Sequence, residues 1–317
     1  MKLDLVDPEL RRGVRRIPRM PIHRSWGRLV VRALIRRRPL GKPVEGVDIS
    51  VLDQGPGLRL YVPAGGGSGA ALLWVHGGGY VIGDAVQDDA FCSATARDLG
   101  IVVVSTNYRL APEHRFPAAL DDAFAAWQWL RQSAASLGVD QHRIAVGGAS
   151  AGAGLAACLV QRLHDTGGAQ PYAQWLFSPM LDDRTAGRRE LDQARHRVWN
   201  NAANRIGWAA YLGTDPGGPH APDYAVAARR GELTALPPAW ISVGDIDLFA
   251  DEDRDYARRL RDAGVDCTFD VIPGAPHGFE AWAADTAIAG GLLARGRTWL
   301  GARLAGPPPS HSPEEQQ

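Results

Sequence analysis

The chain has 317 residues, of which 45% are hydrophobic and 22% charged, a composition typical of a globular protein with one large α/β domain or two small ones. Its 35 basic and 35 acidic side chains balance, which excludes a global field that would attract nucleic acid or an anionic membrane. The first residues lack the apolar core of a signal peptide, and no stretch approaches the ~20 apolar residues of a membrane-spanning helix. We therefore expect a cytoplasmic protein with no nucleic-acid partner and no stable membrane insertion.

The N-terminal segment is basic: residues 1–50 carry thirteen Lys and Arg against five Asp and Glu. Such a segment could contact a membrane surface or an RNA, but a solvated helical face is the preferred interpretation. Apolar side chains at helical spacing are expected to pack on the body of the protein. They are Leu29, Val30, Ala33 and Leu34. Residues 1–44 are accordingly predicted to form an N-terminal helical cap.

Short β-branched runs alternate with helical patterns along residues 45–305. This rhythm predicts an α/β catalytic domain with a mostly parallel central sheet flanked by helices. A hairpin over 45–62 is followed by a strand that runs into a Gly-rich loop over 71–79. Further strands are expected at 101–108, 143–150, 173–179, 239–245 and 267–274, and helices at 121–132, 151–165 and 251–263. Residues 183–224 have no strand signal and are predicted to form a cap insertion. Residues 306–317 are predicted to be a disordered tail.

Three cysteines, Cys92, Cys158 and Cys267, are too few and too far apart for a disulfide framework or a zinc site. We therefore expect no metal and no cofactor. Cys158 falls in an apolar helical run and is interpreted as an inert buried thiol.

Residues 148–152, Gly-Ala-Ser-Ala-Gly, match the pattern G-x-S-x-G between a predicted strand and a predicted helix. In this context Ser150 lies on a sharp, strained turn that exposes its Oγ, and the flanking glycines let strand and helix approach closely. The helix N-terminus adds free amides where an oxyanion would form. The alternative is a small-residue helix that only packs on the sheet, but the context favours a nucleophile.

Three glycines, Gly77 to Gly79, follow the strand at 71–75. The amides of Gly77 and Gly78, together with that of Ala151, are predicted to form an oxyanion hole. A phosphate-binding loop is the poorer interpretation, because no Lys-Ser/Thr follows and the G-x-G-x-x-G spacing is missing. His76 precedes the loop and is expected to be a structural hydrogen-bonding residue.

The general base is expected on a loop after a late strand, in the chain order nucleophile, acid, histidine. His277 lies in such a loop, Pro-Gly-Ala-Pro-His-Gly-Phe at 273–279. Glycine and proline on both sides favour a loop that presents the imidazole, so His277 is the predicted base.

Four aspartates compete for the role of the acid. Asp247 lies between a predicted strand and helix, where its carboxylate could accept the imidazole N–H, and it is favoured over Asp245. Asp251 and Asp253 open the next helix and are interpreted as capping and dipole partners.

Five segments together resemble the hormone-sensitive-lipase-like (family IV, bacterial HGGG-type) carboxylesterases of the α/β-hydrolase superfamily. They are HGGGY (76–80), NYRLAPEHRFPAALDDAFAAWQWL (107–130), GASAG (148–152), LPPAWISVGDIDLFADED (236–253) and HGF (277–279). The resemblance spans roughly residues 70 to 300. It implies an N-terminal helical cap, no metal, and hydrolysis of short- to medium-chain acyl or aryl esters. Position by position it marks Ser150, Asp247 and His277 as the catalytic triad and Gly77, Gly78 and Ala151 as oxyanion-hole donors.

Two residues depart from the family pattern. Ala149 stands where an Asp usually precedes the nucleophile, and Ala153 replaces a glycine. Neither touches the catalytic atoms, so we expect an effect on reactivity and pH optimum rather than loss of activity. Within the stretch 107–130, Arg109, Glu113 and Asp121 are expected to form a buried salt-bridged brace beneath the oxyanion loop.

The leading function is a serine carboxylic ester hydrolase that forms an acyl-enzyme with a small-molecule ester. A lactonase or arylformamidase would use the same residues. A catalytically weak small-molecule receptor on this scaffold would lack the catalytic histidine, and His277 argues against it. A membrane-associated lipase ranks third, because no large apolar flap is evident. The sequence is also compatible with a homodimer.

Four aromatic side chains are expected to line the substrate pocket and to limit the length of the acyl chain. They are Trp208, Tyr211, Phe279 and Trp282. Specificity should therefore rise from acetyl to about butyryl or hexanoyl esters and then fall.

Overall fold

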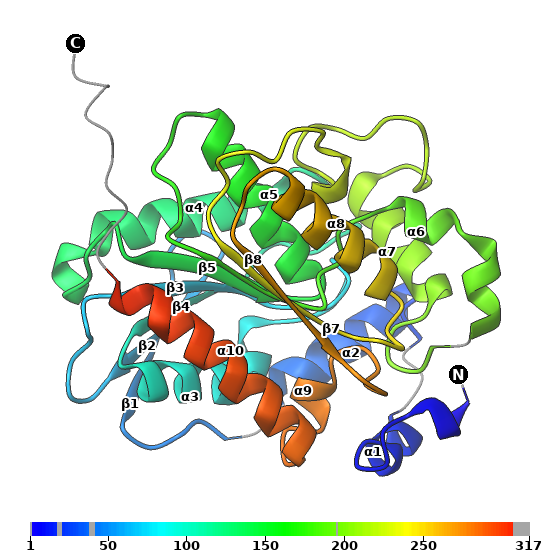
Figure 1. Ribbon diagram of the computed structural model, residues 1–317, viewed down its shortest axis with the longest axis horizontal. Helices are drawn as coiled ribbons and strands as arrows, with labels where there is room; N and C mark the ends of the chain where they lie inside the picture. The colour runs from blue at the N-terminus through cyan, green and yellow to red at the C-terminus, as the bar shows by residue number, and fades with distance from the viewer. Residues whose placement is uncertain (1, 18–20, 38–41, 195, 307–317) are drawn as a thin grey trace.

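The computed structural model describes residues 2–17, 21–37, 42–194 and 196–306. Within these residues an eight-stranded sheet crosses the molecule in the order β1-β2-β4-β3-β5-β6-β7-β8 (Figure 1). Its strands are β1 (Val47–Leu52), β2 (Leu58–Pro63), β3 (Ala71–Val75), β4 (Val102–Thr106), β5 (Ile144–Ala149), β6 (Gln174–Phe177), β7 (Ala239–Gly244) and β8 (Cys267–Ile272). The β1–β2 and β2–β4 pairs are antiparallel, and the other pairs are parallel. The expected hairpin, strands and mostly parallel sheet are confirmed.

Helices cover both faces of the sheet. Helices α4 (Ala118–Ser133), α5 (Ala151–Asp165) and α8 (Ala250–Asp262) lie on one face, and α3 (Asp89–Leu99) and α10 (Ala287–Ala305) on the other (Figure 1). Successive side chains of a strand point to opposite faces. Leu73 and Val75 of β3 therefore enter one hydrophobic core, while Leu72 and Trp74 enter the other.

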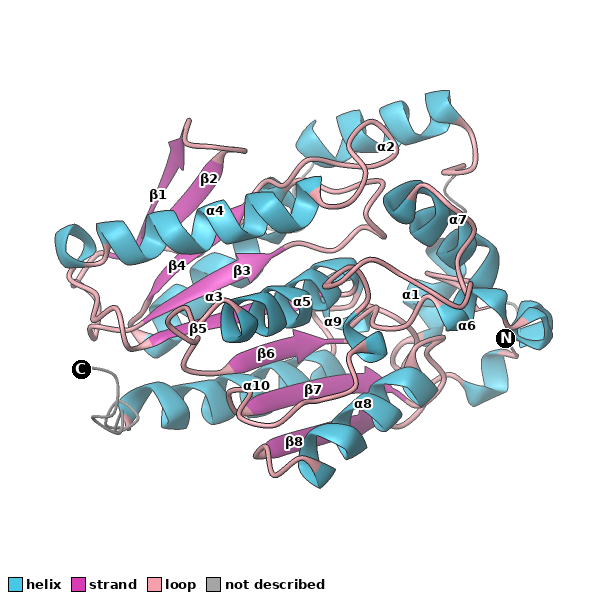
Figure 2. Cartoon of the chain, turned by 90° about the horizontal axis from the view of Figure 1, so that it is seen from above, coloured by secondary structure: helices cyan, strands magenta, loops and turns pink. Residues whose placement is uncertain are grey.

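The two segments predicted to form caps contain helices joined by turns and loops. Their elements are η1 (Leu3–Leu5), α1 (Arg11–Arg16), α2 (Ser25–Arg37), α6 (Arg184–Gly187), η4 (Arg189–Ala194) and α7 (Asn201–Leu212). Figure 2 places α1, α6 and α7 beyond the carboxyl ends of the parallel strands. In sheets of this kind ligands bind at that edge. The predicted tail at 306–317 lies, apart from Gly306, outside the described residues. No helix in the described ranges combines the length and the apolar character needed to cross a bilayer.

The N-terminal segment packs against the loop that carries His277. Val6, Leu10 and Val14 are buried in the same core as Phe279, and the amide of Asp7 donates to the carbonyl of Gly274 (2.9 Å). The described N-terminal residues thereby brace this loop from outside the sheet.

The predicted inward face of α2 is wrong. Leu29, Val30 and Leu34 are each about half exposed (49–59%), and Ala33 is exposed as well. The helix turns a different face inward because Arg32 reaches the carbonyl oxygens of Val81 (2.9 Å) and Ala111 (2.8 Å). The side chains of Leu29, Val30 and Leu34 therefore face outward, while Val31 is buried.

The predicted brace beneath the oxyanion loop is also wrong, because its three members have separate partners. Arg109 binds Asp122 (2.9 Å), Glu113 binds Arg32 (2.9 Å) and Asp121 binds Arg162 (2.6 Å). The side chains of Arg109, Glu113 and Asp121 are all partly exposed. Each is an ion pair at the surface between two elements rather than part of a buried network.

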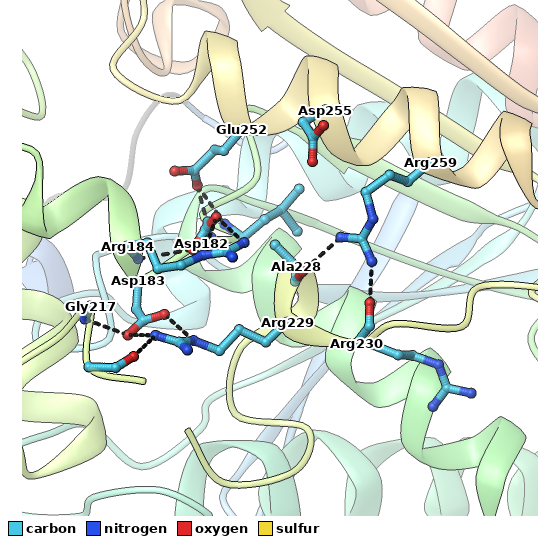
Figure 3. A network of polar contacts seen from close by, with 12 residues as sticks. Asp182, Asp183, Arg184, Gly217, Ala228, Arg229, Arg230, Glu252, Asp255 and Arg259 are labelled. Carbon is cyan, nitrogen blue, oxygen red and sulfur yellow. Dashed lines mark hydrogen bonds and ion pairs between the residues drawn. The ribbon is translucent and has the colours of Figure 1, made fainter. Parts of the chain in front are cut away.

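A polar network fastens the start of the 183–224 segment to the sheet domain (Figure 3). Asp183 is buried and accepts from Arg229 Nε (2.6 Å) and from the amide of Gly217 (2.7 Å). The buried carboxylate of Glu252, on α8, accepts from the backbone amides of Leu181 (2.8 Å) and Asp182 (3.1 Å). These contacts position the chain as it leaves β6.

We expect Asp183→Ala to destabilise the fold by about 3–5 kcal/mol, because it strands the largely buried guanidinium of Arg229 without its counter-ion. Urea unfolding measures the loss. Glu190→Ala is the matched control, since its pair with Arg188 is exposed on both sides, and it should leave the unfolding midpoint unchanged. Equal unfolding midpoints for the two variants would contradict this assignment.

Candidate active site

Ser150 lies at the tight junction between β5 and α5. Its backbone has φ 54° and ψ −122°, a left-handed conformation that is strained for a residue with a Cβ. The junction is tight because a Cβ on Gly148 would lie 2.6 Å from the carbonyl oxygen of Gly152, and one on Gly152 would lie 2.1 Å from the carbonyl oxygen of Val75. The expected strand-turn-helix arrangement around Ser150 is present.

His277 connects Ser150 to Asp247. Its Nε2 lies 2.9 Å from Ser150 Oγ, and its Nδ1 lies 2.8 Å from Asp247 Oδ2. Because an ionised carboxylate can only accept, Nδ1 carries the proton and donates it, which leaves Nε2 as the acceptor for the serine hydroxyl. The amide of Phe249 donates to the other oxygen of Asp247 (3.1 Å). The carboxylate is thus held at both oxygens.

Two opposing effects act on the pKa of His277. Burial lowers this pKa. The charge of Asp247, its hydrogen bond to the imidazole and the charge of Glu280 together raise the pKa by more than burial lowers it. The result is an imidazole with a pKa above the ordinary value. Its protonated form is therefore stabilised where a proton from Ser150 would arrive.

We expect the rate constant kcat/KM to rise with pH through an apparent pKa above the ~6.5 of an ordinary histidine, because His277 must be neutral to accept a proton. Asp247→Asn removes the raising interactions, so the remaining activity should rise at lower pH. Initial rates on a soluble ester across the pH range measure both profiles. Identical acid limbs in the two proteins would contradict the assignment of the base.

The glycine loop lies beside Ser150. A Cβ on Gly77 would be 3.4 Å from the Cβ of Ser150, so the loop backbone passes next to the hydroxyl. Gly78 has φ +132°, and a Cβ there would lie 2.0 Å from the carbonyl oxygen of Ile82. Ala151 is the first residue of α5, where an amide has no partner within the helix. Gly77 and Ala151 thus lie beside Ser150, and Gly78 follows Gly77 in the same loop.

His76 is buried away from the serine. Its Nδ1 lies 2.8 Å from the carbonyl oxygen of Gly77, and its ring stacks on Tyr108 with centroids 4.3 Å apart. Burial lowers its pKa to about 4, so it is neutral near pH 7. These contacts are those of a structural residue.

The remaining acids occupy other places. Asp245 accepts from the amide of Gly274 (2.7 Å) and so holds the loop of His277. Asp251 and Asp253 lie in the first turn of α8, the position predicted for dipole partners, but the capping prediction is wrong because the N-cap residue is Phe249. Asp251 is exposed and pairs with Arg254 (3.1 Å). Asp253 is fully buried, with no hydrogen-bond partner among the described residues.

The aromatic residues expected in the pocket lie elsewhere. Trp208 and Tyr211 are buried and pack on Tyr80, with centroids 5.2 and 4.1 Å apart. Phe279 is buried in the core on the α10 side. Trp282 is half-buried and donates from Nε1 to the carbonyl of His277 (3.0 Å). The first three fill the core, and the fourth supports the histidine loop.

A cavity of about 220 Å³ instead borders Ala149, the residue before the serine. The residues of its wall include Trp74, Phe91, Asp88 and Glu280. The sequence analysis missed this lining. Two features of the sequence could have indicated it: the pair Asp88-Asp89 after the glycine loop, and Glu280, three residues after His277.

Comparisons with known proteins agree with this geometry. Residues 72–281 match a family described as alpha/beta hydrolase fold. The chain is 38% identical to carboxylic ester hydrolase LipN of Mycobacterium tuberculosis over 70% of its own length and 60% of the LipN chain, so it spans less than two thirds of that relative. It is 34% identical to esterase LipI of the same organism over 78% of both chains.

Solved structures extend the match to almost the whole chain. A bacterial heroin esterase superposes with a TM-score of 0.88 at 34% identity, covering 96% of this chain and 100% of that one. Esterase LipW from Mycobacterium marinum gives a TM-score of 0.84 at 32% identity, covering 96% of this chain and 98% of that one. The chain therefore belongs to the α/β-hydrolase fold family, in its hormone-sensitive-lipase-like carboxylesterase branch.

Proposed function

We propose that the protein is a serine carboxylic ester hydrolase in which Ser150 is the nucleophile, His277 the general base and Asp247 the orienting acid. The observation that carries the proposal is the continuous chain from Ser150 Oγ to His277 Nε2 (2.9 Å) and from Nδ1 to Asp247 (2.8 Å). Relatives named ethyl acetate hydrolase and acetyl-hydrolase support the reaction class. Release of p-nitrophenol from p-nitrophenyl acetate tests it, and a pure preparation without turnover would overturn it.

In the acylation step His277 Nε2 takes the proton of Ser150 while Oγ attacks the ester carbonyl carbon. The negative charge that develops on the carbonyl oxygen is stabilised by the amides of Gly77, Gly78 and Ala151. When the intermediate collapses, the imidazolium gives its proton to the departing alcohol. Water then attacks the acyl-enzyme, with His277 again as the base, and releases the acid.

The buried carboxylate of Asp247 stabilises the imidazolium that each of these steps produces. Its side chain has no exposed surface, so the attraction is not screened by solvent as at a surface. The resulting rise in the pKa of His277 favours proton transfer from the serine hydroxyl.

We propose short- to medium-chain esters as substrates, because the cavity beside Ala149 has a volume of only about 220 Å³. Each methylene that enters it contributes ~0.8 kcal/mol until the far wall is met. In a p-nitrophenyl ester series from two to sixteen carbons, kcat/KM should peak near four to six carbons. Leu293→Ala shortens a side chain of the cavity wall and should move the peak to longer chains. A peak at twelve or more carbons in the parent protein would contradict a length limit set by this cavity.

We also propose a cytoplasmic location. Cys92, Cys158 and Cys267 are free, buried thiols, which suits a reducing compartment. Recovery of the native protein in the periplasmic or secreted fraction of its own host would contradict this location.

A further inference from the structure

The cavity beside Ala149 is lined by neighbours of the proposed catalytic residues. Ala149 directly precedes Ser150, and Glu280 lies three residues after His277. Gln87, also in its wall, donates from Nε2 to the carbonyl oxygen of Gly77 (3.4 Å). A substituent of an ester bound at Ser150 would enter this space.

Glu280 is an unpaired acid in the wall of this cavity. Its side chain is about nine-tenths buried, and within the described ranges no other residue donates a hydrogen bond to its carboxyl group. Burial raises its pKa to about 7, although a backbone hydrogen bond and the charge of His277 act in the opposite direction. Because burial disfavours a carboxylate, a positive charge that enters the cavity would stabilise its ionised form.

A second acid, Asp88, faces the same space. It accepts a hydrogen bond from Trp74 Nε1 (2.7 Å), and burial raises its pKa to about 6. The charge of Asp88 also raises the pKa of Glu280, so the two carboxyl groups lie near each other. One basic residue, Arg297, is part of the wall; its guanidinium pairs with Asp98 (3.2 Å) and lies 5.8 Å from the centroid of the Phe91 ring. Among the described residues neither Asp88 nor Glu280 forms an ion pair with a basic side chain.

The rest of the wall is suited to the methyl or methylene groups of a cation. Trp74 and Phe91 stand with centroids 4.4 Å apart, and Phe177 lies 5.6 Å from Phe91. Aromatic rings attract cations and exclude water, while nearby carboxylates supply the opposite charge. Ala149 contributes only a methyl group, which leaves the space beside the serine open.

We propose that this cavity is a cation subsite, and that the enzyme selects esters carrying an alkylammonium group that Glu280 and Asp88 bind. The proposal rests on the ester hydrolase function and names a substrate class for it. Binding places the positive charge between the two acids, with its alkyl groups on the rings of Trp74 and Phe91. The positive charge then offsets the repulsion between the two ionised carboxylates.

Matched esters that differ only in charge test the proposal. In the first pair, acetylcholine has a trimethylammonium group on the alcohol side and 3,3-dimethylbutyl acetate has a neutral tert-butyl group in its place. In the second pair, p-nitrophenyl 4-(trimethylammonio)butyrate and p-nitrophenyl 5,5-dimethylhexanoate differ in the same way on the acyl side. In at least one pair kcat/KM should favour the cation by about tenfold. Ratios of one or below in both pairs, in a protein that hydrolyses the neutral esters, would overturn the subsite and leave the hydrolase function intact. Failure on every ester would instead overturn the hydrolase function.

Variants locate the effect. Glu280→Gln should reduce the charged-to-neutral ratio about tenfold, and Asp88→Asn, which keeps an acceptor for Trp74, should also reduce it. The ratio cancels any effect of Glu280 on His277, because both esters of a pair depend on the same base. Asp285→Asn is the control, since Asp285 is an exposed acid five residues further along, and its ratio should equal that of the parent. Thermal unfolding confirms that each variant is folded. A ratio unaffected by both cavity variants, or lowered equally by Asp285→Asn, would overturn the assignment.

Discussion

Replacing Ser150 by Ala is expected to reduce kcat by about 10⁶ while the protein stays folded. The substitution removes only Oγ, the atom that lies 2.9 Å from His277 Nε2. Alanine keeps the Cβ of serine, so the strained backbone at φ 54° is not strained further. The loss is read from p-nitrophenyl acetate turnover, and thermal unfolding reports on the fold.

Ser136→Ala is the control for this experiment. Ser136 is exposed and donates only to the carbonyl of Ser133 (2.8 Å), so its removal should leave kcat unchanged. If Ser150→Ala kept more than about a hundredth of the parent rate, Ser150 could not be the nucleophile.

Asp247→Asn is expected to reduce kcat by about 10⁴. Asparagine offers an N–H or a carbonyl oxygen to His277 Nδ1 and no longer enforces the tautomer in which Nε2 accepts from the serine. It also removes the charge that stabilises the imidazolium. Steady-state kinetics on the same ester give the loss.

Two neighbouring aspartates serve as comparisons. Asp251→Asn changes an exposed carboxylate paired with Arg254 and should have no effect on kcat. Asp245→Asn weakens the contact to the amide of Gly274 and should cost less than Asp247→Asn, because it acts only on the position of the loop. A greater loss in Asp245→Asn than in Asp247→Asn would show that the orienting acid is misassigned.

The sheet and the positions of the three proposed triad residues were predictable because their signals are local. Ser150 follows a β-branched strand and precedes a small-residue helix, and Gly and Pro on both sides of His277 enforce a loop. In an α/β sheet all such strand-end loops meet at one edge. The structure brings Ser150, Asp247 and His277 into contact there.

The inward face of α2 was not predictable from its periodicity. A helix with apolar residues at helical spacing offers that face for packing, yet Arg32 finds acceptors on Val81 and Ala111. Those carbonyl oxygens lie far from Arg32 in the sequence, so the local sequence of α2 does not predict these hydrogen bonds. The capping expectation failed for a related reason, since it depended on the residue at which α8 begins.

The lining of the cavity was hidden for a different reason. Hydrophobicity does not distinguish an aromatic residue in the core, such as Trp208, from one that faces a pocket, such as Phe91. Asp88 and Glu280 lie far apart in the sequence, and only the fold places them in one wall. Burial is the largest cause of the raised pKa of each.

Covalent labelling tests the central claim most directly. A fluorophosphonate reacts with an activated serine, and the bound phosphonate can be located by mass spectrometry of peptides. We predict one label per chain on Ser150, loss of ester turnover in proportion to labelling, and much slower labelling in Asp247→Asn. Complete inactivation with the label on another residue, or full labelling of Ser150 without loss of turnover, would contradict the account.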